Sequence, residues 1–543
     1  MFLSAIHLKF TYWDWAVLIG YLLLTTWVGH VMRGKNATIR DFFLGGRSLP
    51  WWAVTGSIIA TEISGVTFIG VPGTLFALNG DFTYMQWGIG SIFARFLVAK
   101  WFVKVYYEQE IYSPYDYMGK RLGSGTKMLA TVLFTLGSVL GQSVRVLVAA
   151  IPLRVVTGVP IEWSIVIIGV FAIGWTLMGG MQTVIWTDVM QFFLFAIGGT
   201  VALLWLISGV DGGWSGFWET AGQYGRLKTW DFTWGFRREL EFTFWVAVIA
   251  VPFQNLTAFG VDQLNAQRMF CCRDAKQAGK ALIYSSFGQL LTLLMLMVGA
   301  ALFVWYHNHP FTPDEANLVK AGAETIANSN VRASAEHDFI FPMWIVTVLP
   351  PGVSGLLLAG IFAACISSLD SILAALSQTT LSAIYHPENR TDQELSEMNL
   401  MRKTRLLIVG WGLALTGFTQ LLNLVREDIP ILPLAFGMTT YTMGPLLGIL
   451  LCALIGRGSM RGLVLGSILS VLLVTFVRID LWVLWIKAGW PFEWLANLPT
   501  LELNDGGSGL LPVYCYAWAW PVTTLITFGC GYLLAKRPAK PVI

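Results

Sequence analysis

The sequence contains few charged residues for its length. Of its 543 residues, 12% are charged and 55% are hydrophobic, whereas soluble domains carry about 25% charge. A soluble domain needs a polar surface to face water, but a chain that lies in a bilayer faces lipid instead. The composition therefore excludes an ordinary soluble domain and predicts a protein that is embedded in membrane lipid.

Clustered basic residues and cysteine motifs are also lacking. The formal net charge is +3, and Lys and Arg fall in short runs between apolar segments, unlike the basic face of a nucleic-acid binder. None of the six cysteines forms a CxxC pair, which argues against a zinc site and a disulfide framework. Nucleic acid is therefore not an expected partner.

Motifs of catalysis are missing as well. The sequence has no HExxH or GxSxG motif, and none of its six histidines lies in the centre of an apolar segment, so a membrane enzyme is a distant alternative. A membrane sensor is equally distant, because no kinase or receiver domain is expected after Ile543. The apolar stretch from Trp13 to Val31 is long enough to span and has no cleavage site after it, so a cleavable signal is not expected.

Long apolar segments dominate what is present. A helix needs about 20 apolar residues to cross a bilayer, and this rule predicts an all-α polytopic protein with about thirteen spans in a single integral membrane domain. Pro350-Pro351-Gly352 should break the ninth span into two pieces. The spans are predicted near 13–32, 51–78, 82–107, 127–156, 161–180, 183–209, 241–266, 278–306, 340–385, 403–424, 430–456, 461–487 and 514–536.

The distribution of basic residues predicts the orientation. Cytoplasmic loops are rich in Lys and Arg, and segments 33–50, 104–127, 268–280 and 386–405 carry four each. We therefore expect a multi-pass protein of the cell membrane with its N-terminus outside and its C-terminus in the cytoplasm. An odd number of spans agrees with that arrangement.

Ionisable residues inside spans are costly and mark candidate functional positions. Arg145, deep in the fourth span, is suited to bind a substrate carboxylate with two hydrogen bonds; the alternatives are that it pairs with an acid such as Glu62 or extends to the interface. Arg95 and Glu62 are predicted to neutralise each other. The full set is Glu62, Arg95, Arg145, Arg154, Asp188, Asp370, Arg478 and Asp480.

The second span is interrupted at mid-depth by Ser64-Gly65 and again by residues 70–73. Such a helix can unwind and expose backbone carbonyls, which are the oxygen ligands that a hard cation such as Na⁺ prefers. The alternative is that Gly and Ser only allow close helix packing. The seventh span has a similar interruption from Pro252 to Gly260 before Asp262, and two broken helices in opposite halves indicate an inverted-repeat transporter.

The ninth span carries the polar run Ser367-Ser368-Leu369-Asp370-Ser371. Ser367 and Ser371 are four residues apart and share a helix face, although hydroxyls that bond back to their own helix are an alternative. In the sixth span, Asp188 follows Trp186-Thr187 near the cytoplasmic end; its alternative role is a charge favoured by the helix dipole.

Together these segments resemble the sodium/solute symporter family, which includes sodium/glucose, sodium/proline, sodium/sialate and sodium/multivitamin transporters. The resemblance covers nearly the whole chain and is specific only when its motifs are taken jointly. The matching pieces are residues 40–47, the interrupted second span, residues 113–117 with Lys120-Arg121, Trp186-Thr187-Asp188, Asp262-Gln263 with Gln267-Arg268, and residues 367–371.

The resemblance implies a leucine-transporter-like core of two inverted five-helix repeats. The repeats would be residues 51–209 and 241–456, preceded by a first helix and cytoplasmic loop in 1–50 and followed by two extra helices in 461–543. It also implies a main sodium site formed by the carbonyls of Ala60, Ile63 and Ala364 with the hydroxyls of Ser367 and Ser368. A second sodium site, found in some members, would use Asp188, Ser367, Asp370 and Ser371.

The substrate positions implied by the sugar-transporting members are Thr67, Gln86, Asn255 and Gln289. Asn255 keeps the residue of those members. Gln86 stands for a Glu and Gln289 for a Lys, and Ala258 stands at the position of their inner-gate tyrosine. We therefore expect a polar pocket that is not a galactose pocket. Ser64 and Arg145 complete the predicted substrate set.

The function expected from the resemblance is sodium-coupled symport of a small organic solute by alternating access. The solute would be a sugar, sialic acid, organic acid, amino acid or vitamin, and the protein is expected to act as a monomer with Na⁺ as its cofactor. The alternative is a proton-coupled symporter of the same fold that uses Asp370 and Asp188.

Overall fold

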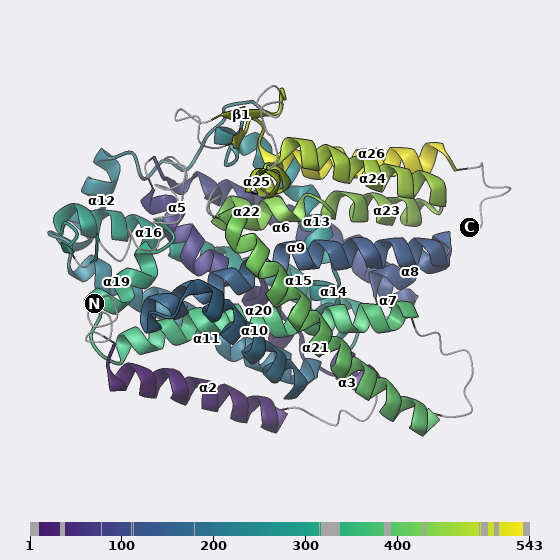
Figure 1. Ribbon diagram of the computed structural model, residues 1–543, viewed down its shortest axis with the longest axis horizontal. Helices are drawn as coiled ribbons and strands as arrows, with labels where there is room; N and C mark the ends of the chain where they lie inside the picture. Colours follow the sequence, from purple (N-terminus) through teal and green to yellow (C-terminus); the bar gives the residue numbers. More distant parts are fainter. Residues whose placement is uncertain are drawn as a thin grey trace.

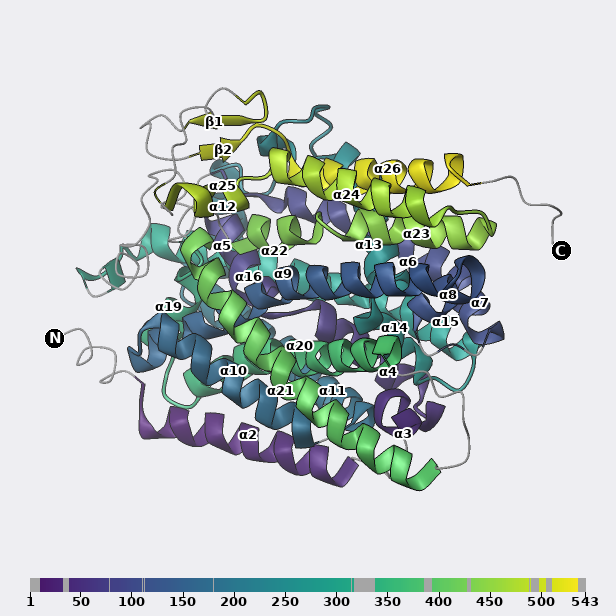
Figure 2. The same cartoon turned by 45° about the vertical axis from the view of Figure 1, so that its right-hand side comes forward.

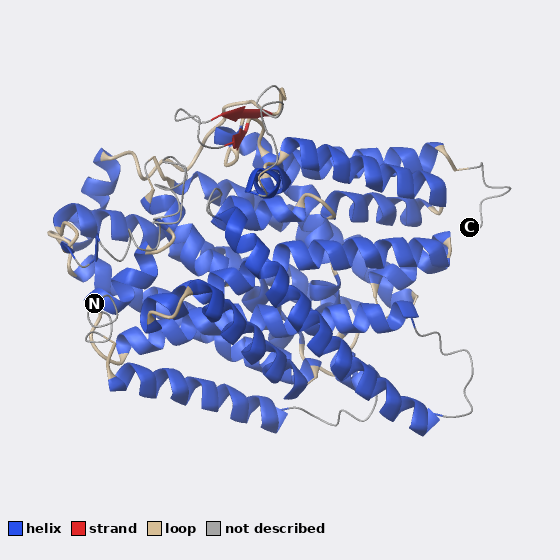
Figure 3. Cartoon of the chain, viewed as in Figure 1, coloured by secondary structure: helices blue, strands red, loops and turns tan. Residues whose placement is uncertain are grey.

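The protein was analysed as a computed structural model. It describes residues 10–32, 39–77, 79–109, 111, 113–178, 180–313, 315–316, 337–384, 393–426, 431–487, 489, 498–503 and 510–535. Within these ranges the regular structure is helical (Figure 3), apart from one antiparallel pair of three-residue strands, β1 (Leu501–Leu503) and β2 (Leu510–Pro512). The helical class predicted from composition is therefore confirmed, with one small hairpin that hydropathy did not indicate.

The first half of the chain forms helices at each of the first six predicted spans. The helices are α2 (Tyr12–Met32), α3 (Ile39–Leu44), α4 (Trp51–Glu62), α5 (Val71–Phe76), α6 (Trp87–Leu97), α7 (Val103–Glu108), α8 (Pro114–Leu122), α9 (Ser124–Thr157), α10 (Ile161–Met178), α11 (Met181–Ser208) and α12 (Gly213–Gln223). Short π or 3₁₀ turns link several of them: Gly45–Arg47, Val66–Gly70, Phe82–Gln86 and Val98–Phe102.

The second half is also helical at every predicted span. Its helices are α13 (Val251–Gly260), α14 (Gln263–Phe270), α15 (Ala275–Tyr284), α16 (Gly288–Asn308), α19 (Ile340–Val348), α20 (Val353–Ile384), α21 (Gln393–Arg426), α22 (Ile431–Thr439), α23 (Met443–Ile455), α24 (Met460–Val477), α25 (Asp480–Lys487) and α26 (Ala519–Leu533). Its short turns are Arg238–Leu240, Val246–Ala250, Ser285–Phe287 and Tyr516–Trp518.

Eight helices of the described chain are long and apolar enough, by length and composition, to cross a membrane alone. The pair Trp51–Glu62 and Val66–Phe76 passes the same test together and is bent by 54°. The interruption predicted in the second span is therefore present. The break predicted at Pro350-Pro351-Gly352 is present as well, because α19 ends at Val348 and α20 begins at Val353.

The long helices run side by side around the central helix α20 (Figures 1 and 2). Helices α23, α24 and α26 pack together along one edge, and α2 lies along the opposite edge. Helix α20 contacts α2, α9, α10, α11 and α21. Of the 18-residue stretch of α20 that is apolar enough to cross a membrane, 94% is buried inside the protein. Its polar residues are therefore shielded from lipid by protein, which is where membrane proteins hold functional polar groups.

Candidate functional site

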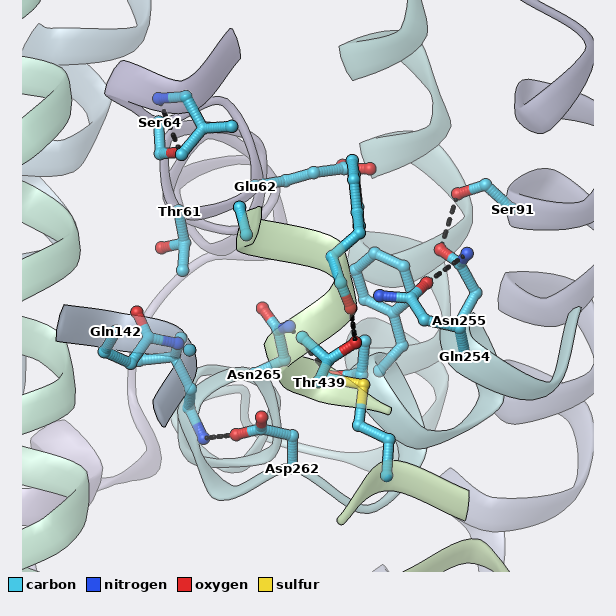
Figure 4. A pocket seen from close by; sticks show the side chains of 18 of the residues that line it. Thr61, Glu62, Ser64, Ser91, Gln142, Gln254, Asn255, Asp262, Asn265 and Thr439 are labelled. Atoms are coloured by element: carbon cyan, nitrogen blue, oxygen red, sulfur yellow. Dashed lines mark hydrogen bonds between the residues drawn. The ribbon is translucent and has the colours of Figure 1, made fainter. Parts of the chain in front are cut away.

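A cavity lies beside the break in the second span. Its volume is about 190 Å³, more than ten times the roughly 15 Å³ that one water needs by the same measure, so a small organic molecule fits there. Residues of α4, α6, α9, α13, α14, α16, α22 and α23 form its walls. Its aromatic side chains come from Tyr84, Trp87, Phe134, Phe259 and Phe436, and the polar ones labelled in Figure 4 surround the same space.

Most of the predicted substrate residues line this cavity. Ser64, Thr67, Arg145, Asn255 and Gln289 are all at its surface, although they come from distant parts of the sequence. Gln86 is buried and is not among the lining residues. Its amide instead donates to the carbonyl of Phe242 at 2.8 Å and accepts from the backbone N–H of Asp231. Gln86 therefore holds the loop beside the cavity.

One side of the cavity contains the ion pair predicted between Glu62 and Arg95. The Arg95 guanidinium bonds to Glu62 Oε1 and donates to the Ser285 hydroxyl at 2.9 Å. Gln289 Nε2 donates to the same Glu62 oxygen at 3.3 Å. Because Arg95 is fully buried, the carboxylate supplies the partner charge that a buried guanidinium requires.

The other polar wall of the cavity contains Arg145. Its Nη1 donates to the carbonyl oxygen of Thr61 at 3.2 Å, and it forms no ion pair within the described residues. The pairing with Glu62 considered from the sequence is absent there, since Glu62 bonds to Arg95. Asp262 is a further acid on the cavity wall, and its Oδ1 caps α14 by accepting from Leu264 N–H at 2.8 Å. The remaining donors of Arg145 are therefore available to a ligand.

The break in the second span exposes the carbonyls that were predicted to bind sodium. Helix α4 ends at Glu62, and the next hydrogen bonds run from Thr67 and Phe68 to the Ser64 carbonyl. No described backbone N–H beyond the break bonds to the carbonyl oxygen of Ala60 or Ile63. A helix end leaves such carbonyls without partners inside the helix, so both are free to bind a cation.

Helix α20 packs directly against this break. A Cβ added to Gly65 would collide with Cys365 Sγ, which places Ala364 and Ser368 within one turn of the contact. The Ser368 hydroxyl is buried and donates to the Ala364 carbonyl at 3.2 Å. The side chain of Ser367 lies outside the described part of the structure. The carbonyl and hydroxyl oxygens that would bind the cation are all neutral, which suits a hard monovalent ion.

The predicted second sodium site contains the Arg268 guanidinium, which the local sequence pattern does not predict there. Arg268 Nη2 lies 3.1 Å from Asp188 Oδ2 and also bonds to the Ser371 hydroxyl. Ser57 donates to Asp188 Oδ2 and accepts from Arg268 Nε at 2.9 Å, and Ser371 donates to Asp370 at 3.1 Å. Arg268 was identified as a motif residue, but no local spacing connects it with Asp188.

Comparison with known proteins agrees with this geometry. The chain is 28% identical over 477 residues to the sodium/sialic acid symporter of Proteus mirabilis, covering 86% of this chain and 90% of that one. It is 28% identical over 390 residues to the sodium/glucose cotransporter of Vibrio parahaemolyticus, covering 68% and 67%. It is 27% identical over 472 residues to the human sodium-coupled monocarboxylate transporter 1, covering 85% and 73%.

The fold is shared with a solved transporter. A substrate-bound, outward-open structure of a Na⁺-coupled sialic acid symporter superimposes with a TM-score of 0.75, covering 98% of this chain and 100% of that one at 24% identity. The sodium:solute symporter family model matches residues 42–470, which confirms the family that the motifs predicted. The chain belongs to the sodium:solute symporter family and is a sodium-coupled transporter, not an enzyme.

Proposed function

We propose that this protein imports a small carboxylate-bearing solute on the sodium gradient by alternating access. The observation that carries the proposal is the contact between the broken second span and α20, immediately beside a polar cavity that contains Arg145. Both the ion position and the solute position would use the same break. Binding at one can therefore favour the conformation that the other requires.

The main sodium site would be formed by the carbonyls of Ala60, Ile63 and Ala364 with the hydroxyls of Ser367 and Ser368. The free carbonyls of Ala60 and Ile63 and the packing of Gly65 on Cys365 support this assignment. In the bound state the Ser368 hydroxyl would turn its oxygen to the ion while its proton keeps the bond to the Ala364 carbonyl.

The solute would bind in the cavity with its carboxylate on Arg145. The guanidinium has donors beyond its bond to Thr61, and a guanidinium binds a carboxylate through two parallel hydrogen bonds. Sialic acid and monocarboxylates, named for two of the relatives, both carry such a group. Ser64, Thr67, Asn255 and Gln289 would contact the rest of the solute from the cavity wall.

A second cation at Asp188, Ser367, Asp370 and Ser371 would have to share Asp188 with Arg268. We therefore propose that the broken span is the coupling site and that the second position binds a cation only after Arg268 moves. The two repeats, residues 51–209 and 241–456, would tilt against each other with the N-terminus outside. Each positive charge that moves into the cell with the solute adds about 2.3 kcal/mol of driving force per 100 mV of membrane potential.

The test compares two buried serines of α20 in proteoliposomes. Ser368→Ala should abolish sodium-stimulated uptake, because it removes a ligand of the proposed site. Ser377→Ala is the matched control, since Ser377 is equally buried and also bonds to its own helix, at 2.7 Å to the Leu373 carbonyl. Sodium-dependent uptake that survives Ser368→Ala unchanged would show that the assignment is wrong.

A further inference from the structure

Two buried amide oxygens on the cavity wall have no hydrogen-bond partner. Gln142 Oε1 and Asn265 Oδ1 are both inaccessible to bulk solvent, and neither accepts a bond from a described group. Native proteins leave few buried polar atoms without partners, and each one calls for an explanation. Since both residues line the cavity, a group that enters it can supply the missing hydrogen-bond donor.

The orientation of the Asn265 amide is fixed by its other end. Asn265 Nδ2 donates to the carbonyl oxygen of Ala258 at 2.8 Å. A carbonyl oxygen only accepts hydrogen bonds, so the amide nitrogen of Asn265 must face the Ala258 carbonyl. The amide oxygen of Asn265 must therefore point the other way. The unpartnered atom of Asn265 is therefore an acceptor, and its complement on a ligand is a hydrogen-bond donor.

Both acceptors line the same cavity as Arg145. Gln142 precedes Arg145 by three residues on α9, which puts the two side chains on one helix face. Asn265 follows Asp262 by three residues at the start of α14, and both residues line the same cavity as Arg145. In Figure 4, Gln142, Asn265 and Asp262 lie on one side of the cavity, with Ser91, Gln254 and Asn255 on the other.

We propose that Gln142 and Asn265 select solutes that carry a hydroxyl or ammonium group on the carbon next to the carboxylate. This inference rests on the proposed function, because it takes the carboxylate to be bound by Arg145. The donor would bond to Asn265 Oδ1 and Gln142 Oε1, and the Asp262 carboxylate beside them strengthens the attraction for an ammonium group. The substrate class is therefore 2-hydroxy or 2-amino acids.

An acid without that donor would leave both oxygens buried and unpaired. Sites built to bond a solute hydroxyl or ammonium reject analogues that lack it more strongly than apolar pockets reject a missing methylene. We expect binding of the analogue to be weaker by about tenfold or more.

The experiment uses the full chain in detergent and in proteoliposomes, with two matched sets of acids in sodium and in potassium. The first set is propionate, L-lactate and L-alanine, and the second is D-gluconate and 2-deoxy-D-gluconate. Sodium-dependent thermal shift reports binding, and competition in counterflow reports transport. We expect the acids with a donor to bind at least about tenfold more tightly than their partners without one; lactate and alanine then distinguish hydroxyl from ammonium.

Three substitutions connect the preference to the named atoms. Asn265→Leu and Gln142→Met keep the side-chain shape and remove the acceptor, so each should reduce the preference while sodium-dependent binding of the acid without a donor persists. Gln254→Met is the control, because Gln254 lines the same cavity but its Oε1 already accepts from Asn255 Nδ2 at 2.7 Å. Gln142 has no hydrogen bond within the described residues, so Gln142→Met still decides the question if Asn265→Leu unfolds.

Equal binding of acids with and without the donor would overturn this inference and leave the sodium-coupled carboxylate transporter intact. A preference that survives both Asn265→Leu and Gln142→Met would also overturn it. Absence of sodium-dependent binding for every carboxylate tested would instead contradict the proposed function, and this inference with it.

Discussion

Asp14 of the first helix caps the N-terminus of α20, the helix that begins 339 residues later in the chain. Its Oδ1 accepts hydrogen bonds from the backbone N–H of Gly352 at 2.8 Å and of Gly355 at 2.9 Å, and from the Ser354 hydroxyl. Asp14 is fully buried. A helix leaves its first N–H groups without partners, and here a carboxylate from another helix satisfies them.

Replacing this cap should destabilise the protein through α20. Asp14→Ala removes the acceptor from Gly352 and Gly355 and should lower the free energy of unfolding by about 1–2 kcal/mol, the usual effect of losing an N-cap. Thermal unfolding in detergent measures the loss. Asp14→Asn keeps one acceptor oxygen and should lose less; equal melting temperatures for wild type and Asp14→Ala would contradict the capping role.

Gly65 in the broken span packs so closely against α20 that we expect a larger residue there to disturb the proposed sodium site. Its φ is −52°, which any residue adopts, but an added Cβ would collide with Cys365 Sγ and lie 3.0 Å from Val148 Cγ1. Gly65→Ala should therefore push the break away from α20 and weaken sodium-stimulated uptake by about tenfold or more, since overpacking costs about 1–3 kcal/mol.

The origin of that effect can be checked by relieving the clash. Cys365→Ala removes the sulfur and should restore part of the sodium response in the double variant. Gly410→Ala on α21 is the control, because nothing lies within 4 Å of a Cβ there. If Cys365→Ala gives no recovery, the loss does not come from this contact.

The buried pair of Asp188 and Arg268 should be strongly coupled. Both side chains are at most 1% exposed, and removing one partner of such a pair leaves a buried charge, at a cost of about 3–5 kcal/mol. Asp188→Asn and Arg268→Met should each lower the melting temperature, and the double variant should lose much less than the sum. Glu108→Gln, in the exposed pair with Lys104, should change stability by less than about 1 kcal/mol. Strictly additive losses would show that the two residues do not act as a pair.

The elements that the sequence predicted well are those controlled by local properties. Hydropathy located a helix at each predicted span, because about 20 apolar residues in a row have few alternatives in a bilayer. Eight helices of the described chain are long and apolar enough to cross alone, and the count of thirteen spans stays a prediction. Pro350 and Pro351 located the break before α20, since proline cannot continue a helix. Ser64-Gly65 located the bend of the second span, because Gly and Ser are weaker helix formers than the apolar residues around them.

The site was less predictable because its contacts are made between segments. Arg268 and Asp188 are separated by 80 residues, so no periodicity relates them. The orientation of the Asn265 amide depends on the Ala258 carbonyl, which becomes its partner only after α13 and α14 meet at their break. Gln86 falls at a substrate position by resemblance, but its bond to Phe242 depends on the path of a loop.

Stability should fall in mild acid because of His337, which lies three residues before α19. Its ring packs on Phe76, with centroids 5.4 Å apart, and burial, helped by the positive charge of Arg226, lowers the pKa of His337 to about 4. The unfolded chain has the ordinary pKa of about 6.5, so between these values the unfolded state binds more protons than the folded state. This contribution to stability is therefore complete above about pH 6.5 and is lost as the pH falls toward 4.

Melting temperatures between pH 7.5 and 5 test this dependence. Each pH unit within the window removes at most about 1.4 kcal/mol, and His337→Gln, which does not titrate, should flatten the curve over the same interval. His309→Gln is the control, because the His309 side chain is exposed to solvent. A curve that falls with the same slope in wild type and in His337→Gln would assign the acid sensitivity to other groups.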